Sequence, residues 1–305
     1  MNDIVIETIG LTRIYKQTTA VDGLNLSVPR GSVFGFLGPN GAGKTTTIHM
    51  LLGNTRPTSG SARLLGRPVN DIHSRRQVGF LPEKTSFYPF LTAKEFLTVL
   101  GRLSGMTGPK LRTRIEETLE TVGLAQRGSD RISTYSRGMV QRLGLAQAIM
   151  HEPELIILDE PTSALDPLGR RDVRDIILQL KAKGCTVFIN SHMLSEIEMT
   201  CDEVAILKAG KVIEAGKLNE LLESSHTVDV EVDEMTDAAM AALRAVTLKI
   251  KFTQLPMRRF TAYVSGPENV PEIARVLVES GVKLLGMAAG RETLEELFVR
   301  VVEDK

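Results

Sequence analysis

A glycine-rich loop between a buried strand and a helix constrains the fold of this chain more than any other feature. Residues 33–37, Val-Phe-Gly-Phe-Leu, have the continuous apolar character of a buried strand, and residues 45–52 favour a helix. The loop between them can turn its backbone N–H groups inward around an anion, and the helix start adds partial positive charge. The order strand, glycine loop, helix therefore predicts a nucleotide phosphate site in an α/β domain.

The loop carries the side chains that Mg²⁺-ATP requires. Lys44 is expected to reach the β- and γ-phosphates and to assist catalysis, and the Thr45 hydroxyl is expected to ligate Mg²⁺. The predicted ATP contacts in this segment are Gly38, Pro39, Asn40, Gly41, Ala42, Gly43, Lys44, Thr45 and Thr46.

Two adjacent carboxylates follow a second apolar run. Residues 155–158 read as a buried strand, and Asp159 and Glu160 come directly after it. In an open parallel sheet the carboxyl ends of the strands face the ligand. If this strand lies beside 33–37, Asp159 can hold Mg²⁺ and Glu160 can polarise an attacking water. An Asp-Glu pair is also common on protein surfaces, so the prediction depends on the apolar run before the pair and on Pro161 after it.

One histidine has a comparable position. His192 follows the predicted strand 187–189, where it could contact the γ-phosphate, although a lone histidine is more often a surface or packing residue. The other histidines lack this context and are assigned no role: His49, His73, His151 and His226.

The chain reads as two pieces, 1–222 and 227–305, joined by a linker at 223–226. The first alternates apolar runs with amphipathic segments and includes a hairpin at 204–214, as an α/β domain does. The second has the order β-α-β-β-α-β of a ferredoxin-like α+β unit, with a helix after it. Its predicted elements are strands 228–232, 247–252, 259–264 and 282–287 and helices 236–246, 270–280 and 293–302.

Composition narrows the classes of function. The 37 basic and 37 acidic side chains balance, which argues against non-specific nucleic-acid binding. Cys185 and Cys201 lack metal-type neighbours and read as reduced cytosolic thiols. The first ten residues do not resemble a signal peptide, and no apolar run approaches the roughly 20 residues of a spanning helix.

Together these residues resemble the nucleotide-binding subunit of an ABC transporter over about residues 1–222. Gly38 to Thr45 matches the family's Walker A motif, and 155–160 matches Walker B with its catalytic glutamate. His192 matches the switch histidine, and Tyr15 stands where the family places an aromatic that stacks on adenine. The resemblance implies a P-loop NTPase fold with a RecA-like core, an antiparallel β subdomain and a helical signature subdomain.

The segment 135–139, Tyr-Ser-Arg-Gly-Met, resembles the family's signature motif. Ser136 can cap the following helix and, with the N–H of Gly138, form a second anion site. In the family this site binds the γ-phosphate held by the other subunit. The D-loop at 163–166 follows, and its Asp166 is expected among the ATP contacts. The resemblance thus implies a head-to-tail dimer, either a homodimer or a heterodimer with a second ATPase.

The sequence departs from the family pattern in three places. Arg137 and Met139 replace the usual Gly and Gln of the signature, a pattern that still resembles the ABC-2-type exporter subgroup. Glu83 stands where the wider family has Gln, and its carboxylate is a candidate Mg²⁺ ligand that also adds negative charge.

The resemblance also implies membrane partners. The aromatic-rich segment 87–92 either receives a coupling helix from a separate permease subunit or packs the helical subdomain. The chain is then expected to be cytoplasmic, peripheral on the inner face of the cell membrane. Residues 227–305 resemble the extension of drug- and antibiotic-resistance ABC ATPases, with a regulatory or dimer-supporting role.

The sequence thus predicts an ATPase subunit that powers an ABC-2-type exporter. Two alternatives are a soluble ABC ATPase acting on ribosomes or DNA and a nucleotide-controlled module that barely hydrolyses ATP. A single cassette with neutral charge and no heptad run argues against the first. The presence of Glu160 and His192 argues against the second, and Glu83 argues weakly for it. The cargo is not readable because the membrane partner selects it.

Overall fold

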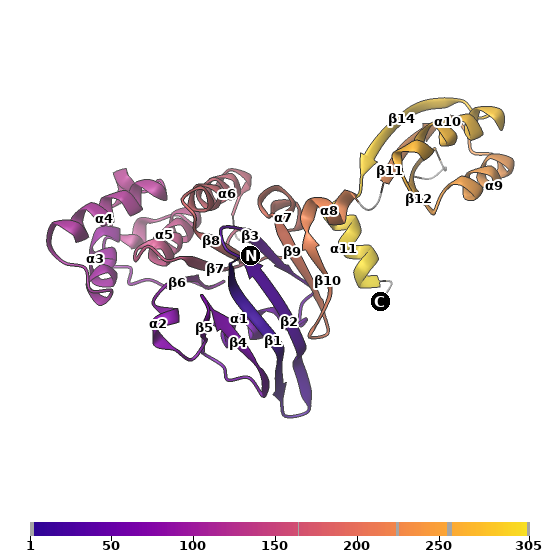
Figure 1. Cartoon of the computed structure of the whole chain (residues 1–305). Helices are drawn as coiled ribbons and strands as arrows, with labels where there is room; N and C mark the ends of the chain where they lie inside the picture. Colours follow the sequence, from indigo (N-terminus) through magenta and orange to yellow (C-terminus); the bar gives the residue numbers. More distant parts are fainter. Residues whose placement is uncertain (1–2, 164, 224–225, 255–257, 304–305) are drawn as a thin grey trace. The chain divides into compact units, whose positions relative to one another are not determined.

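The structure is a computed structural model that describes residues 3–163, 165–223, 226–254 and 258–303. The chain divides into two compact units, one ending at Gly216 and one starting at Lys217 (Figure 1). Each unit has its own hydrophobic core.

A six-stranded sheet forms the centre of the first unit, with the strand order β10-β9-β3-β8-β7-β6. The strands β3, β9, β8, β7 and β6 pair in parallel, and the side chains of β3, β7 and β8 are buried throughout, which explains their apolar sequences. The strands are β3 Val33–Leu37, β6 Val78–Leu81, β7 Leu155–Asp159, β8 Thr186–Asn190, β9 Glu203–Lys208 and β10 Lys211–Lys217.

The strand order corrects one expectation. The strand that carries Asp159 does not lie beside β3, because β8 is inserted between β3 and β7. The carboxyl ends of parallel strands still meet at one edge of the sheet, so Asp159 keeps its place at the ligand edge.

A second sheet of the first unit is antiparallel and has the order β2-β1-β4-β5. Apolar side chains of both sheets and of helix α1 share one core, in which Val5, Phe36 and Ile48 are fully buried. The strands are β1 Ile4–Tyr15, β2 Thr18–Pro29, β4 Ser59–Leu64 and β5 Arg67–Pro68.

Three helices of the first unit form a group at one edge of the six-stranded sheet. Helices α3, α4 and α5 gather beside the β6 edge of the six-stranded sheet, where α5 contacts β6 (Figure 1). Thr92 and Glu95 form a capping box that starts α3. The helices are α1 Lys44–Leu51, α2 Ile72–Arg75, α3 Ala93–Leu103, α4 Gly108–Thr121, α5 Arg137–Ile149, α6 Pro167–Ala182 and α7 Leu194–Thr200, with 3-10 turns at Ala125–Arg127 and Ile132–Thr134.

The second unit contains an antiparallel sheet of order β12-β13-β11-β14. Alternate residues of β11 and β13, such as Val230 and Phe260, are buried in the same core as Leu243 of α9 and Leu277 of α10. The elements are α8 Leu218–Glu223, β11 His226–Val232, α9 Asp237–Val246, β12 Lys249–Gln254, β13 Arg259–Val264, a 3-10 turn at Pro267–Asn269, α10 Val270–Glu279, β14 Leu284–Arg291 and α11 Leu294–Glu303.

The predicted element order of this unit is confirmed, but several boundaries differ. The last strand begins later than predicted, and it continues to Arg291 because its final residues pair with the start of β11. Apolar alternation does not reveal this extension, since residues 288–291 carry small or charged side chains. Of the predicted linker, Glu223 ends α8 and His226 starts β11, while residues 224–225 lie outside the described residues. Within the described part of the chain, no helix is long and apolar enough to span a membrane.

Candidate nucleotide site

The glycine loop lies between β3 and α1, and Gly43 caps the helix with a φ of 105°. A side chain at Gly43 would collide with the backbone carbonyl of Ala20 on β2. Only glycine therefore fits both the backbone conformation and the close approach of β2. The loop N–H groups and the start of α1 form the concave donor surface that an anion requires.

The side chain of Lys44 folds back over this loop. Its ammonium nitrogen lies 2.6 Å from the carbonyl oxygen of Gly38 and 3.1 Å from that of Pro39. Burial lowers the pKa of Lys44, whereas the nearby carboxylates of Glu160 and Asp159 oppose that shift. The loop thus holds a buried cation where phosphates would supply the missing negative charge.

Asp159 and Asn190 are directly paired in register on β7 and β8. The Asn190 side-chain amide donates a hydrogen bond to the Asp159 carboxylate. Burial raises the pKa of Asp159, the hydrogen bond from Asn190 opposes this, and the charges of Glu160 and Glu83 raise it further. The Asn190 Oδ1 atom is buried without a hydrogen-bond partner among the described residues. This orphaned oxygen and the buried Asp159 carboxylate favour a cationic or water ligand.

Glu160 turns away from the strand with a positive φ of 53°, a conformation that costs energy in a non-glycine residue. The backbone N–H of Glu160 donates a hydrogen bond to the carbonyl oxygen of Asn190, with 2.8 Å between nitrogen and oxygen, and this bond holds the turn. The Glu160 Oε2 atom lies 2.8 Å from His192 Nδ1, so the two side chains form an ion-pair contact when the histidine is protonated.

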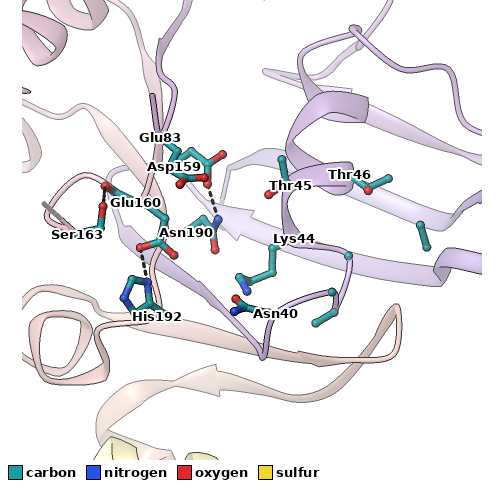
Figure 2. Close-up of a pocket in the computed structure, with 14 residues that line it drawn as sticks. Asn40, Lys44, Thr45, Thr46, Glu83, Asp159, Glu160, Ser163, Asn190 and His192 are labelled. Carbon is teal, nitrogen blue, oxygen red and sulfur yellow. Dashed lines mark hydrogen bonds and ion pairs between the residues drawn. The ribbon is translucent and has the colours of Figure 1, made fainter. Parts of the chain in front are cut away.

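These groups line one cavity of about 490 Å³ (Figure 2). Figure 2 shows Asp159, Glu83 and Asn190 on one side and Lys44 and Thr45 on the other. The lining residues are Ala20, Asn40, Gly41, Ala42, Gly43, Lys44, Thr45, Thr46, Glu83, Asp159, Glu160, Ser163, Asn190 and His192.

Three of these residues were not assigned a role from the sequence. Asn190 belongs to the segment predicted as a strand before His192, Ser163 belongs to the predicted D-loop, and Ala20 carries no functional group. The one available signal is that Asn190 is a polar residue ending an apolar strand two positions before His192. Its partnership with Asp159 depends on strand register, which the sequence does not reveal.

Other predicted ATP contacts lie outside this cavity. Gly38 and Pro39 contribute the carbonyls that hold Lys44. Tyr15 is partly exposed, with the Arg13 guanidinium 4.4 Å from its ring centroid.

Ser136, Gly138 and Asp166 do not line the cavity, whereas Ser163 at the start of the D-loop does. Ser136 caps α5 by accepting a hydrogen bond from the Met139 N–H at 3.3 Å. Asp166 caps α6 in the same way through the Gly169 N–H at 2.9 Å. Both caps leave their residues exposed.

The donor set suits Mg²⁺ bound together with a nucleotide. No group of three or more His, Cys, Asp or Glu side chains arranged to hold a metal occurs within the described ranges. Mg²⁺ commonly takes one or two carboxylates and completes its shell with phosphate oxygens and water. Thr45, Asp159 and Glu83 around the cavity fit that pattern.

The chain has a buried lysine at a phosphate loop and carboxylates after the ends of two adjacent parallel strands, β6 and β7, which places it among the P-loop nucleoside triphosphatases. Comparison with known proteins identifies the family within this class. The sequence model of the ABC transporter family matches residues 21–163.

Relatives extend this match to nearly the whole chain. An uncharacterized ABC transporter ATP-binding protein of Synechocystis, sll0415, is 37% identical over 99% of this chain and 85% of its own length. The bacitracin transport ATP-binding protein BcrA of Bacillus licheniformis is 36% identical, covering 98% of this chain and 97% of its own. A solved ATP-binding cassette, dimeric in a post-hydrolysis state with ADP and Pi, is 26% identical with a TM-score of 0.64, over 70% of this chain and 98% of that one.

The chain therefore belongs to the ABC transporter family, as an ATP-binding subunit that hydrolyses ATP to energise transport. The predicted family and enzymatic activity are confirmed.

Proposed function

We propose that this chain drives an ABC-2-type exporter from the cytoplasmic face of the cell membrane, as a dimer bound to separate permease subunits. The carrying observation is that the likeness to BcrA, a bacitracin transport protein, spans both units rather than the cassette alone. The second unit, which we propose to be a ferredoxin-like accessory domain, is thus shared with a relative named for antibiotic transport.

The cavity residues have distinct proposed roles in hydrolysis. Glu160 orients and deprotonates the attacking water, and His192, in contact with Glu160, positions that carboxylate and contacts the γ-phosphate. Lys44 moves from the loop carbonyls to the β- and γ-phosphates. Thr45, Asp159 and Glu83 would hold Mg²⁺, which neutralises phosphate charge when bound.

The exposed signature supports a site shared between two subunits. Ser136 is exposed and does not line the chain's own cavity, so an anion bound there would come from another molecule. Gly138 lies near Leu165, since a side chain at Gly138 would be 3.9 Å from that leucine. Gly138 of the signature and Leu165 of the D-loop are therefore neighbours, and we propose that this region contacts the ATP of the partner subunit. Asp166 rigidifies this region by capping α6.

The aromatic segment near Glu83 divides into packing and exposed side chains. Phe87 packs edge-on against Phe96 of α3, with ring centroids 5.0 Å apart. Tyr88 and Phe90 are 64% and 67% exposed and lie beside each other. Both sequence interpretations thus find support, because Phe87 packs the helical group while Tyr88 and Phe90 remain available to a permease helix.

Co-purification tests this proposal. The chain should co-purify with a hydrophobic protein encoded in the neighbouring reading frame. Replacing Tyr88 and Phe90 by Ser should release that protein while the isolated chain keeps its ATPase rate. Leu248→Ser, at an exposed leucine of the second unit, is the control and should co-purify normally. If the double variant still co-purifies as well as the control, these aromatics do not form the docking surface.

A further inference from the structure

The outer edge of β14 differs from the other sheet edges of the molecule. β14 is the outermost strand of the second unit's sheet, and among the described residues it pairs only with β11 (Figure 1). Residues 284–290, Leu-Leu-Gly-Met-Ala-Ala-Gly, contain no charge and no proline. An unpaired strand of this length and composition is a template for pairing with another chain.

The remaining edges carry the devices that normally prevent such pairing. β12, at the opposite edge of the same sheet, has Lys249 and Lys251. The edges of the other two sheets are short or interrupted: β5 has two residues including Pro68, β6 has four, β10 bears charges at Lys211, Glu214 and Lys217, and β2 contains Asp22 and ends at Pro29. The pairing of β14 with β11 is irregular at Leu285, but residues 286–290 of β14 carry no charge or proline, unlike the other edges.

Exposure at β14 supports an interaction surface. Ala288, Ala289 and Gly290 are exposed, and Leu285 is 62% exposed. Val278 is likewise exposed on α10, the helix that contacts β14. Leu285 on β14 and Val278 on the contacting helix are thus exposed apolar side chains in this part of the second unit.

We propose that β14 pairs antiparallel with β14 of a second copy of this chain, so that two four-stranded sheets join across a two-fold axis. A two-fold axis requires each residue pair to occur twice with exchanged roles, and only antiparallel pairing of identical strands satisfies this. In that arrangement the uncharged residues of one strand face the uncharged residues of the other. The small side chains at Gly286, Ala288 and Gly290 leave room for close approach.

This contact is separate from the nucleotide-dependent one and uses the proposed dimer only as a source of a second copy. No residue of the nucleotide cavity takes part in the contact between the two β14 strands. The contact should therefore form without nucleotide, which distinguishes its failure from a failure of the proposed ATP-driven dimer.

Sedimentation of the full chain, without nucleotide and with EDTA, tests the pairing over a concentration series. The native chain should dimerise, and Ala288→Lys should raise the dissociation constant at least tenfold, because it places a charge in the middle of the edge. The new lysine lies opposite Asp229 on β11, so the fold is expected to tolerate it. Ala241→Lys, the same change at an exposed position of α9, should dimerise like the native chain.

Hydrogen exchange on the native chain supplies a second readout that does not depend on a variant. Amides of 284–291 should become more protected as the protein concentration rises. The proposal would be overturned if Ala288→Lys dimerised as tightly as the native chain, or if the native chain stayed monomeric at about 100 µM. It would also be overturned if the protection of amides 284–291 did not change with protein concentration.

Discussion

Asn190 donates a hydrogen bond from its side-chain amide to the carboxylate of Asp159 on the neighbouring strand. The two residues are opposite each other in the β7–β8 register and both are buried. This pairing orients the acid that faces Lys44 and Thr45, and it counteracts part of the rise in the pKa of Asp159. Asn190 is thus a positioning residue for the proposed Mg²⁺ site.

Replacing Asn190 by Ala should weaken the binding of Mg²⁺ more than the binding of ATP. The pKa of Asp159 rises further when the hydrogen bond is lost, and the carboxylate is no longer oriented. The Mg²⁺ concentration for half-maximal ATPase should increase about tenfold. Asn25→Ala serves as the control, at an exposed asparagine that accepts a hydrogen bond from the Gly10 N–H in the antiparallel sheet. An unchanged Mg²⁺ titration in Asn190→Ala would refute this positioning role.

The raised pKa of Asp159 makes a prediction about pH. The folded chain binds this proton more tightly than the unfolded chain, so the ionised carboxylate destabilises the nucleotide-free fold above the raised pKa. Asp159→Asn should increase the free energy of unfolding by about 1–3 kcal/mol at pH 7.5. The gain should shrink as the pH falls through the raised pKa, because native Asp159 is then protonated. Urea unfolding without Mg²⁺ measures the free energy of unfolding of the native chain and of the variant at each pH. A variant less stable than the native chain at pH 7.5 would contradict the argument.

Glu160→Gln should bind ATP, stall hydrolysis and accumulate a dimer. The amide cannot accept a proton from water, so the turnover rate should fall roughly 100- to 10,000-fold. Single-turnover hydrolysis and gel filtration with ATP provide the measurements. Hydrolysis at the native rate would show that Glu160 is not the base.

Ser136→Arg should abolish hydrolysis while nucleotide binding by the monomer stays nearly intact. Ser136 caps α5 away from the cavity of its own chain, so only the contact to the partner's ATP is blocked. Fluorescent nucleotide titration at low protein concentration separates the two effects. Loss of binding in the monomer would argue against a role across the dimer.

Truncation tests the independence of the two units. The sequence places the boundary at 222–227, whereas the structure groups α8 with the second unit from Lys217 onward. A chain ending at residue 226 should remain a folded ATPase, and a chain ending at residue 216 should as well if α8 belongs to the second unit. An insoluble first unit in both cases would show that it depends on the second. Circular dichroism and ATPase assays report the outcome.

The phosphate loop and the buried strands of the central sheet can be predicted from short contiguous stretches of sequence. The phosphate loop is local, because Gly43, Lys44 and Thr45 are neighbours on one turn and their geometry depends on glycine backbone freedom. The apolar runs that become β3, β7 and β8 are likewise evident, since strands buried on both faces require continuous apolar side chains. The motifs on these segments were sufficient to predict the family and ATP hydrolysis.

Tertiary structure decided how these segments meet. The insertion of β8 between β3 and β7 brings Asn190 onto Asp159, a contact 31 residues apart that no local pattern encodes. The side-chain directions that partly bury Phe87 against Phe96 of α3 and expose Phe90 depend on tertiary packing. The unprotected edge of β14 exists only because the sheet order leaves that strand outermost. Local sequence sets backbone preference and burial, whereas strand order and register arise from long-range packing and hydrogen bonding, which a single sequence does not display.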